Sequence, residues 1–436
     1  MKLSSIETYL THLTRQSLFH HEPWKRYRFK RMQHLLDLLK NPERKIPHYI
    51  HITGTSGKGS VAIMLATILK TSGYKTGLLI SPHPTHITER WQINNRPMSI
   101  GIFEKLFTKI YKQIQVYERS KAYQEFGMIS YGELMTIIGL YYFAQEKVEW
   151  SVIEVSVGGR NDSTNIIPYK DVAVITTIGI DHTKHLGSTK ASILKEKLGI
   201  LQRGIPLFTA EKDKKILDLM QQECKKQKSI LYKINNQYQI LPTHNSSNHF
   251  IYQKTSYTLP VLGLHQIRNA LLSITIAKYL KLPEQKIQKA LQTIILPIRL
   301  EVISKNPTII LDAAHNRDKM KSTALSIKDL IKSSPGKVYI LLASSHRRDI
   351  LMRFKPLTTL HPPTIICTQG PSTLSPDLFF DIIKKLFPDS LVLADQNYHH
   401  AFSTLKKQLQ PHDVLLVTGS VYLSGALRNK KPTTLP

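Results

Sequence analysis

Short apolar runs alternate along the first part of the chain with longer segments in which apolar residues recur at helical spacing. The short runs are rich in β-branched residues and have the length of buried strands. They cover residues 49–53, 76–80, 151–155 and 171–179. The longer segments, predicted to be helices, cover 61–70, 99–119 and 131–146, and residues 1–45 are also helical in character. Strands that alternate with helices predict a parallel sheet with helices on both faces.

The same alternation begins again near residue 298. The stretch 206–262 mixes short strands with polar loops, and 266–281 is predicted to be a helix. Further strands are predicted at 308–311, 337–342, 364–367, 390–393 and 413–417, with helices at 323–332, 378–386 and 401–409. A chain of 436 residues exceeds the usual size of one domain. We therefore expect an α/β protein with a parallel-sheet domain over 1–297, followed by a smaller Rossmann-like α/β domain over 298–436.

The first strand ends in a glycine-rich turn that leads directly into a helix. The turn consists of Gly54, Thr55, Ser56, Gly57, Lys58, Gly59 and Ser60. Its glycines allow several backbone N–H groups to face one point, and the lysine and the helix N-terminus add positive charge there. The usual nucleotide-binding pattern has Ser or Thr directly after the lysine, whereas here a glycine intervenes. A turn without a ligand is the alternative, but the flanking strand and helix favour a phosphate-binding loop (P-loop) in an ATPase domain.

Three polar residues lie at or just beyond the carboxyl ends of other predicted strands. They are Ser81, Glu154 and His182. In a parallel sheet these ends meet at one edge, where ligands bind. A hydroxyl, a carboxylate and an imidazole beside a triphosphate suit Mg²⁺, which prefers oxygen ligands and substrate phosphates. Each residue alone could be an ordinary turn or loop residue, so the prediction depends on their joint placement.

Composition adds one unusual feature, a formal net charge of +29 from 60 Lys and Arg against 31 Asp and Glu. This balance fits nucleic-acid binding through counterion release, attraction for small polyanions such as ATP, or a general lysine bias. Basic residues recur along the entire chain, and no nucleic-acid-binding module is recognisable. We therefore expect no nucleic-acid partner.

Two histidine pairs suggest zinc at first sight. They are His83 with His86 and His182 with His185. Neither pair has the helical spacing with an intervening glutamate that marks a zinc helix, and no cysteine lies near them. We therefore do not expect a zinc site.

The cysteines and the N-terminal residues suggest where in the cell the protein is found. Cys224 and Cys367 lie far apart and are expected to be free thiols in a reducing compartment. The N-terminal residues show no secretory signal, and no segment has the roughly 18 consecutive apolar residues of a membrane span. We expect a cytoplasmic monomer without membrane contact.

A series of short motifs extends from the phosphate loop, 51–60, through both predicted domains. They are Ser81-Pro82-His83, Glu89-Arg90, Glu154-Val155, Gly158-Gly159-Arg160, 162–165, 179–182, 195–200, His265-Gln266, Asn269-Ala270, Arg299-Leu300-Glu301, 312–316 and Thr418-Gly419-Ser420. In this order they resemble the folylpolyglutamate synthase/dihydrofolate synthase family of the Mur ligase superfamily, from about residue 28 to residue 428. The loop of that family also carries the glycine found here as Gly59.

The resemblance implies an ATP-dependent amide ligase. ATP phosphorylates a carboxylate, and the amino group of L-glutamate then attacks the acyl phosphate. Lys58 and the loop would hold the phosphates, and Ser81, Glu154 and His182 match the ligands of one Mg²⁺. Lys197 matches a lysine that is carbamylated and binds a second Mg²⁺; an exposed helix lysine is the alternative reading.

Further roles are implied residue by residue. Asn269, Arg299 and Asp312 match nucleotide contacts, whereas His315 and Ser420 match residues facing the reaction centre and the glutamate side. The pterin-substrate region is matched by Ser130, Tyr131, Gly132, Glu133, Asn161, Asp162 and Ser163. Ser156 and Asn161 depart from the family pattern near this region, which leaves the substrate preference open.

The expected function is therefore the addition of glutamate to dihydropteroate and to reduced folates. A single-activity enzyme is the near alternative. A ligase acting on a cell-wall peptide would need a further N-terminal domain, for which the stretch before the first strand is too short. A basic P-loop NTPase that acts with nucleic acid is the alternative from another class.

Overall fold

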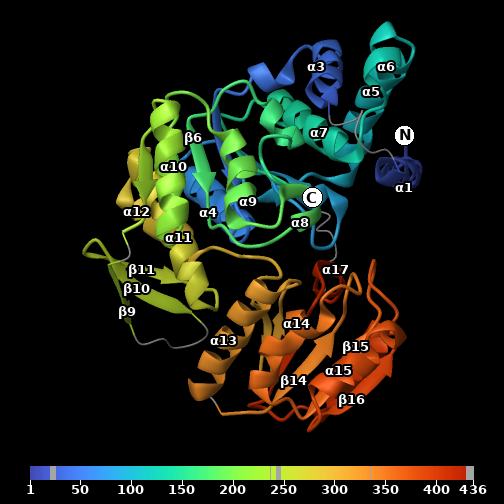
Figure 1. Ribbon diagram of the computed structural model, residues 1–436, viewed down its shortest axis with the longest axis vertical. Helices are drawn as coiled ribbons and strands as arrows, with labels where there is room; N and C mark the ends of the chain where they lie inside the picture. The colour runs from blue at the N-terminus through green and yellow to red at the C-terminus, as the bar shows by residue number, and fades with distance from the viewer. Residues whose placement is uncertain (20–25, 236, 242–246, 334, 429–436) are drawn as a thin grey trace. The chain divides into compact units, whose positions relative to one another are not determined.

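A computed structural model describes residues 1–19, 26–235, 237–241, 247–333 and 335–428 (Figure 1). Contacts along the chain divide it into two compact units. Unit 1 comprises Met1–His83, Ile87–Asn235 and Leu271–Ala290, and unit 2 comprises Pro84–His86, Asn236–Ala270 and Leu291–Pro436. The boundary after residue 297 stays a prediction; the division by contacts differs from it in assigning residues 84–86, 236–270 and 291–297 to unit 2.

Unit 1 is built on an eight-stranded sheet with the order β4-β3-β2-β5-β1-β6-β7-β8. Its strands are β1 (His48–Thr53), β2 (Thr76–Leu79), β3 (Trp91–Ile93), β4 (Arg96–Pro97), β5 (Trp150–Glu154), β6 (Val172–Ile175), β7 (Leu207–Thr209) and β8 (Leu231–Lys233). The six strands from β2 to β8 in this order are parallel, and β3 and β4 are antiparallel. Strands β2, β5 and β6 are fully buried, which explains their unbroken apolar runs.

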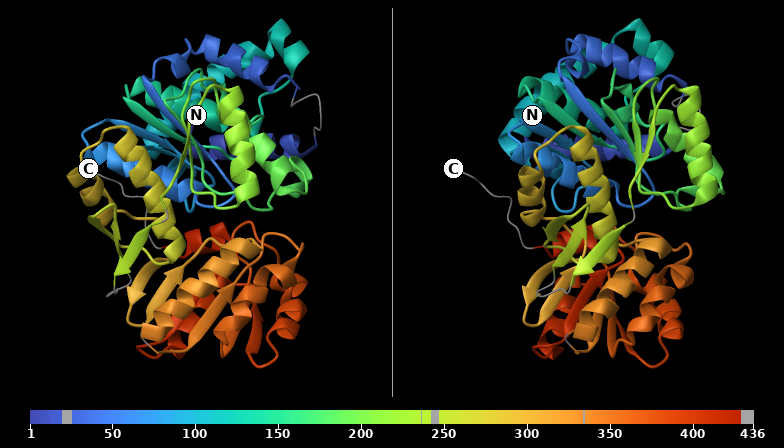
Figure 2. Two further views of the ribbon diagram at one scale, coloured as in Figure 1. Left: turned by 60° about the vertical axis from the view of Figure 1, so that its left-hand side comes forward. Right: turned by 90° about the vertical axis from the view of Figure 1, so that its left-hand side faces the viewer.

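Helices cover both faces of this sheet (Figure 2). They are α1 (Leu3–Phe19), α3 (Arg28–Leu38), α4 (Lys58–Thr71), α5 (Ile100–Glu118), α6 (Lys121–Phe126), α7 (Tyr131–Gln145), α8 (Thr183–Leu186), α9 (Lys190–Lys197), α10 (Lys214–Lys226), α11 (Leu264–Tyr279) and α12 (Glu284–Gln292), with 3-10 turns η1 (Pro42–Arg44), η2 (Ile87–Arg90), η3 (Ser163–Ile166) and η4 (Leu198–Ile200). Helices α1, α3, α5 and α7 bury an aromatic core around Trp91, Phe103, Phe107 and Phe143. Helices α9 and α10 bury a separate aliphatic core.

Unit 2 contains a six-stranded sheet, β12-β13-β17-β14-β15-β16, in which only β12 runs antiparallel to its neighbour. Its strands are β12 (Glu301–Lys305), β13 (Thr308–Leu311), β14 (Val338–Leu342), β15 (Thr364–Thr368), β16 (Leu391–Asp395) and β17 (Val414–Thr418). The helices are α13 (Arg317–Ser333), α14 (Ile350–Phe354), α15 (Phe380–Leu386), α16 (Tyr398–Gln408) and α17 (Val421–Ala426), with η5 (Lys355–Leu360) and η6 (Pro376–Leu378). One core lies on each face of this sheet, so the prediction of a Rossmann-like α/β fold is confirmed.

A small antiparallel sheet, β11-β10-β9, precedes these strands. It consists of β9 (Tyr238–Leu241), β10 (Asn248–Tyr252) and β11 (Thr255–Leu259). Both cysteines are buried free thiols, as expected. Among the helices of the described residues, none combines the length and the apolarity that crossing a membrane requires.

Candidate functional site

The phosphate loop lies at the centre of the carboxyl edge of the unit 1 sheet, because β1 pairs with β5 on one side and β6 on the other. Gly54 has φ +147, and a Cβ added to it would lie 1.8 Å from Thr176 Oγ1. Gly57 has φ +89 and precedes the first residue of α4. The Thr55 N–H donates to Thr177 O at 2.8 Å. Glycine is therefore required at both positions, by close packing at the first and by positive φ at both.

Two lysines converge on this loop from different helices. Lys58 Nζ and Lys197 Nζ each donate to Gly54 O at 3.0 Å. Burial, and to a smaller extent the charge of Lys58, lowers the pKa of Lys197 to about 7. Asp181 and Asp162 act in the opposite direction, so both carboxylates lie within electrostatic range of Lys197. The structure thus places Lys197 inside the predicted site, not on an exposed helix face; its carbamylation stays a prediction.

The sheet also brings the predicted Mg²⁺ ligands to the same edge. Ser81 N donates to Glu154 Oε2 at 3.0 Å, and the Ser81 hydroxyl lies 3.1 Å from that of Ser156. Glu154 is only 3% exposed, and His182 follows β6 with φ +51, at the start of α8. Within the described part of the chain, no three His, Cys, Asp or Glu side chains gather closely enough to hold a metal ion. These few oxygens fit Mg²⁺, which completes its shell with water and substrate phosphates.

The loop after β5 holds the predicted substrate residue Asp162 rigidly. Asp162 Oδ2 accepts from Val157 N at 2.9 Å. Its Oδ1 accepts from the N–H and the hydroxyl of Thr164, at 3.0 and 2.6 Å. Asn161, the preceding residue, is exposed. The carboxylate of Asp162 is therefore oriented by three hydrogen bonds.

The two predicted parts of the substrate region lie side by side. The Ser163 hydroxyl donates to Gly132 O at 3.1 Å and lies 2.7 Å from the Thr136 hydroxyl. Tyr131 packs under the Arg90 guanidinium, 5.7 Å from its carbon to the ring centroid, and Arg90 Nε donates to His83 Nδ1 at 3.1 Å. The start of α7 and the 161–163 loop therefore form one surface.

Two predicted substrate residues have a structural role that accounts for their contacts. Ser130 and Glu133 form the capping box of α7, in which each side chain accepts from the other's backbone N–H. Glu133 is fully buried and accepts from Arg31 at 2.7 and 2.6 Å and from Arg28 at 3.2 Å. The carboxylate therefore anchors α3 to the start of α7, and its role in substrate binding stays a prediction.

We expect Glu133→Ala to lower the free energy of unfolding by about 3–5 kcal/mol, because it leaves the buried Arg31 guanidinium without its partner. Urea denaturation measures this loss. Glu125→Ala, at an exposed position of α6, is the matched control and should change stability by no more than about 0.5 kcal/mol. Equal stability of the two variants would contradict the anchoring role.

In unit 2, the predicted nucleotide residue Asp312 directly follows β13. Its carboxylate is buried and accepts from the Thr323 hydroxyl at 2.7 Å, and from Leu300 N and Ala314 N at 3.1 Å each. Burial raises the pKa of Asp312 above its ordinary value. Leu300, which donates one of these hydrogen bonds, directly follows the predicted nucleotide residue Arg299 in the chain. The Arg299 guanidinium itself donates to Pro297 O at 2.9 Å.

The remaining predicted site residues of unit 2 are His315, Ser420 and Asn269. His315 Nδ1 lies 2.9 Å from Ala313 O, and its Nε2 lies 3.2 Å from Lys319 Nζ. Ser420 is fully buried at the end of β17, the strand next to β13, and its hydroxyl caps α17. Asn269 lies on α11 and donates to Gln266 Oε1 at 2.9 Å. His315 and Ser420 therefore follow adjacent strands, whereas Asn269 comes from a separate helix.

Several residues that contact the site or lie near it were not predicted to do so. Thr176 donates to Ser56 O at 2.6 Å and so supports the phosphate loop from β6. Asp181, within electrostatic range of Lys197, lies directly before His182 in a motif that was recognised but not assigned. His51 of β1 contacts Thr164 of η3. None of these relations has a local sequence signal, because each depends on which strands are neighbours.

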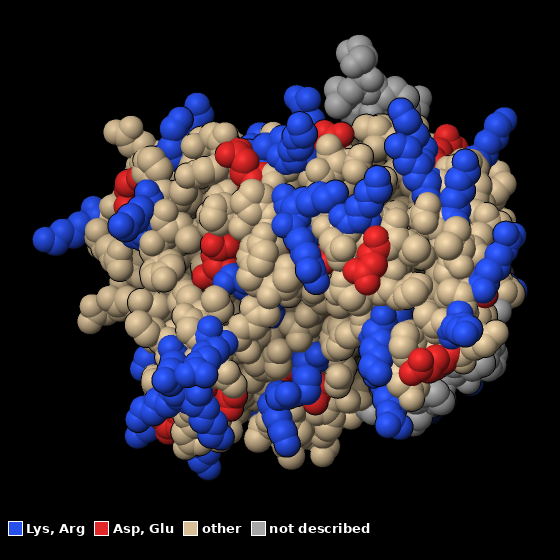
Figure 3. Space-filling model, turned by 90° about the horizontal axis from the view of Figure 1, so that it is seen from above, with Lys and Arg blue, Asp and Glu red and all other residues tan. Residues whose placement is uncertain are grey.

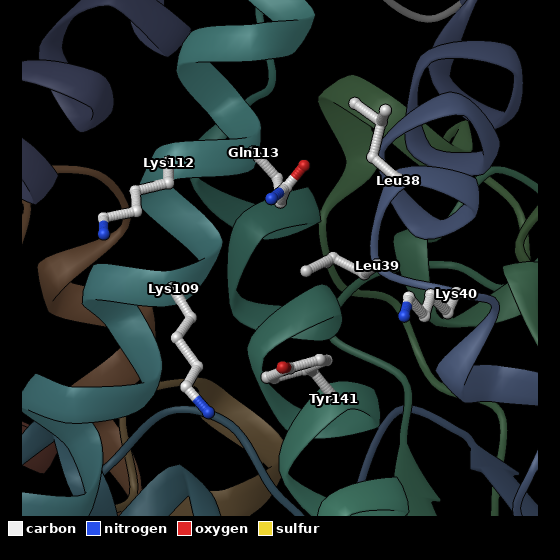
Figure 4. A pocket seen from close by; sticks show the side chains of 7 residues that line it. All are labelled: Leu38, Leu39, Lys40, Lys109, Lys112, Gln113 and Tyr141. Atoms are coloured by element: carbon white, nitrogen blue, oxygen red, sulfur yellow. The ribbon is translucent and has the colours of Figure 1, made fainter.

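The distribution of positive charge can be followed on one face of the molecule. On the face drawn in Figure 3, Lys and Arg side chains are scattered among other residues and form no single stripe. A hollow of about 240 Å³ lies where α3, α5 and α7 meet (Figure 4). Its lining includes Lys40, Lys109, Lys112 and Tyr141, the last near the far end of α7 from the substrate region. The hollow is therefore separate from the carboxyl-edge site.

Comparisons with known proteins show the family to which the chain is similar. Residues 102–277 match the Mur ligase middle domain, and residues 298–421 match the Mur ligase, glutamate ligase domain. The chain is 32% identical over 308 residues to dihydrofolate synthase/folylpolyglutamate synthase of Buchnera aphidicola, covering 70% of this chain and 71% of that protein. It is 29% identical to folylpolyglutamate synthase of Lacticaseibacillus casei, covering 92% and 93%. The structure of Mycobacterium tuberculosis folylpolyglutamate synthase with ADP is similar, with a TM-score of 0.85, 25% identity and 99% coverage of both chains.

Proposed function

The chain belongs to the folylpolyglutamate synthase/dihydrofolate synthase family of Mur ligases, and we propose that it joins L-glutamate to dihydropteroate and to reduced folates at the expense of ATP. The observation that carries the proposal is the convergence of Lys58 and Lys197 on Gly54 O, at the sheet edge that also presents the Ser81–Glu154 pair. That edge combines a phosphate loop, two cationic or reactive amines and oxygen ligands for a metal. The activity requires all three.

The phosphates of ATP would bind the loop from Gly54 to Ser60. The N–H groups of the loop and the N-terminus of α4 supply partial positive charge, and Lys58 supplies a full one. In this arrangement Lys58 Nζ needs only to exchange its hydrogen bond to Gly54 O for a phosphate oxygen. The family resemblance further implies that Asn269, Arg299 and Asp312 are nucleotide contacts.

The reaction would proceed in two steps. The carboxylate of the pterin acid attacks the γ-phosphorus of ATP, which gives an acyl phosphate and ADP. The glutamate amine then attacks the acyl carbon, an amide bond forms, and inorganic phosphate leaves with the former carboxylate oxygen. Such chemistry depends mainly on positioning and on charge neutralisation, which Lys58 provides at the transferring phosphoryl group. His315 and Ser420 would act on the glutamate side.

Mg²⁺, held by Ser81, Glu154 and His182, would neutralise phosphate charge and orient the triphosphate. A carbamate on Lys197 would hold a second ion. The lowered pKa supports this modification, because a neutral amine adds to CO₂ and releases a proton, whereas an ammonium cannot. Lys58, whose positive charge disfavours the ammonium form of Lys197, would stabilise the negative carbamate.

The acid would bind against the surface formed by Tyr131, Gly132 and the 161–163 loop. Asp162 there offers an oriented carboxylate acceptor suited to N–H donors of a pterin ring. A single activity, on dihydropteroate alone or on reduced folates alone, is the second candidate. It is favoured by one observation, the departure from the family pattern at Ser156 and Asn161, close to this surface.

The test is ADP release by the purified protein with Mg-ATP, L-glutamate and bicarbonate. Three arms contain dihydropteroate, tetrahydrofolate or no acid. We expect release with both acids and little without either; release with only one acid would establish the single-activity alternative. A fourth arm replaces the acid with single-stranded DNA or RNA. Stimulation in that arm alone, falling steeply with salt, would contradict the ligase proposal and identify a nucleic-acid-dependent NTPase.

A further inference from the structure

A fully buried histidine lies on the strand that leads into the phosphate loop and faces the substrate loop. His51 is 0% exposed, and its Nε2 lies 2.8 Å from the Thr164 hydroxyl. Two residues further along β1, on the same face of the strand, the Thr53 hydroxyl donates to Gly158 O at 2.6 Å. Strand β1 therefore contacts the 157–164 loop at two points with polar side chains.

The direction of the hydrogen bonds follows from the count of protons. The Thr164 hydroxyl donates to Asp162 Oδ1 at 2.6 Å, and a hydroxyl has only one proton to donate. The single hydroxyl proton of Thr164 must therefore occupy that bond. Thr164 Oγ1 can then only accept from His51, so His51 carries its proton on Nε2.

The other ring nitrogen agrees with this assignment. Among the described residues, His51 Nδ1 has no hydrogen-bond partner, although it is buried. Burial, with the charge of Lys170 adding to it, holds the pKa of His51 well below its usual range. His51 is therefore a neutral donor whose only bonded nitrogen is the one that faces Thr164.

We propose that His51 is a positioning residue for the pterin acid, which acts through Thr164 to fix the carboxylate of Asp162. His51 fixes the rotation of the Thr164 hydroxyl and, by donating to it, strengthens the hydrogen bond that Thr164 donates in turn. Both lone pairs of Asp162 Oδ1 then accept hydrogen bonds from Thr164. Oδ2 accepts one hydrogen bond, from Val157 N, and keeps a second lone pair that points in a defined direction. The inference rests on the proposed function, because it assigns Asp162 to substrate binding.

The test compares His51→Phe, which keeps a planar ring without the donor, with His51→Gln, whose amide N–H₂ can reach the same position. We expect His51→Phe to raise KM for dihydropteroate about tenfold, because the variant loses one hydrogen bond from the series that ends on the carboxylate of Asp162. KM for ATP and for glutamate should stay within about twofold of the unmodified protein. His51→Gln should recover most of the lost affinity.

The matched control is Tyr49→Phe. Tyr49 is also buried on β1, and its hydroxyl donates to Glu43 O at 2.8 Å, away from Asp162. This variant loses a buried hydrogen bond from the same face of the same strand, so it measures the effect of a small core perturbation. Its KM for dihydropteroate should not change.

A double-mutant cycle separates positioning from packing. Thr164→Val removes the donor to Asp162 and should raise KM for dihydropteroate at least as much as His51→Phe, whereas Thr164→Ser should restore it. In the Thr164→Val background, His51→Phe should have almost no further effect on this KM. Additive effects, or equal changes in KM for all three substrates, would show that His51 only fills the core and would overturn the inference. Absence of turnover with any pterin acid in the unmodified protein would instead refute the proposed function, and this inference with it.

Discussion

Lys58→Ala should lower kcat by about 10²–10³-fold or more, while the protein stays folded. A single preorganised donor at a transition-state charge typically contributes this much, and Lys58 supplies a full charge. Its ammonium group is held 3.0 Å from Gly54 O at the mouth of the loop, and no carboxylate within the described residues forms a salt bridge to it. Steady-state ADP release measures the loss, and circular dichroism measures the fold.

Lys70→Ala is the matched control for this experiment. Lys70 lies on the same helix, α4, but at its exposed end. Its replacement should leave kcat and KM within about twofold, since isolated surface charges contribute little. If Lys58→Ala keeps activity within about tenfold of the unmodified protein, the phosphate-loop assignment is wrong.

Lys197→Ala should reduce activity by at least about a hundredfold, and acetate or propionate should restore part of it. A short carboxylate in the space left by the side chain can supply the anionic oxygens that the carbamate would provide for the second Mg²⁺. Lys195→Ala, one exposed position on the same helix, should change neither activity nor its response to acetate. Loss of activity without rescue by any short carboxylate would count against the carbamate.

The same lysine predicts a pH dependence. Because the pKa of Lys197 is lowered to about 7, the amine is mostly neutral above pH 7 and mostly charged below it. Carbamylation needs the neutral amine, so bicarbonate should activate CO₂-depleted protein strongly at pH 8 and weakly at pH 6. The unmodified protein and Lys197→Ala should be compared at both pH values. Activation by bicarbonate that persists in Lys197→Ala would contradict the assignment.

The strands of both sheets could be predicted because most are buried on both faces. Thr308–Leu311 was predicted without error and β14, β15 and β17 to within one residue, since a fully buried parallel strand is an unbroken apolar run. The hairpin β3–β4 and the edge strand β12 were not predicted. They are short or half-exposed, and their pairing partners are set by tertiary contacts that leave no local pattern.

The site was predictable where a motif has its own chemistry. The glycines at 54 and 57 are explained by the conformation and the packing of the loop. The Ser130–Glu133 pair has the spacing of a capping box, and the structure contains that capping box, whereas the substrate role of the pair stays a prediction. The meeting of Lys197 with Gly54, and of His51 with Thr164, could not be derived locally, because both depend on the strand order β5-β1-β6.

The measurement that tests the central claim most directly follows oxygen from the acid into phosphate. Dihydropteroate labelled with ¹⁸O in its carboxylate is incubated with the protein, Mg-ATP, L-glutamate and bicarbonate, and the inorganic phosphate released is analysed by mass spectrometry. An acyl-phosphate ligase transfers one labelled oxygen to phosphate for each amide formed, so we expect singly labelled phosphate in step with product. Unlabelled phosphate alongside ADP release would mean that ATP is hydrolysed by water, and would contradict the assignment of this site as an amide ligase.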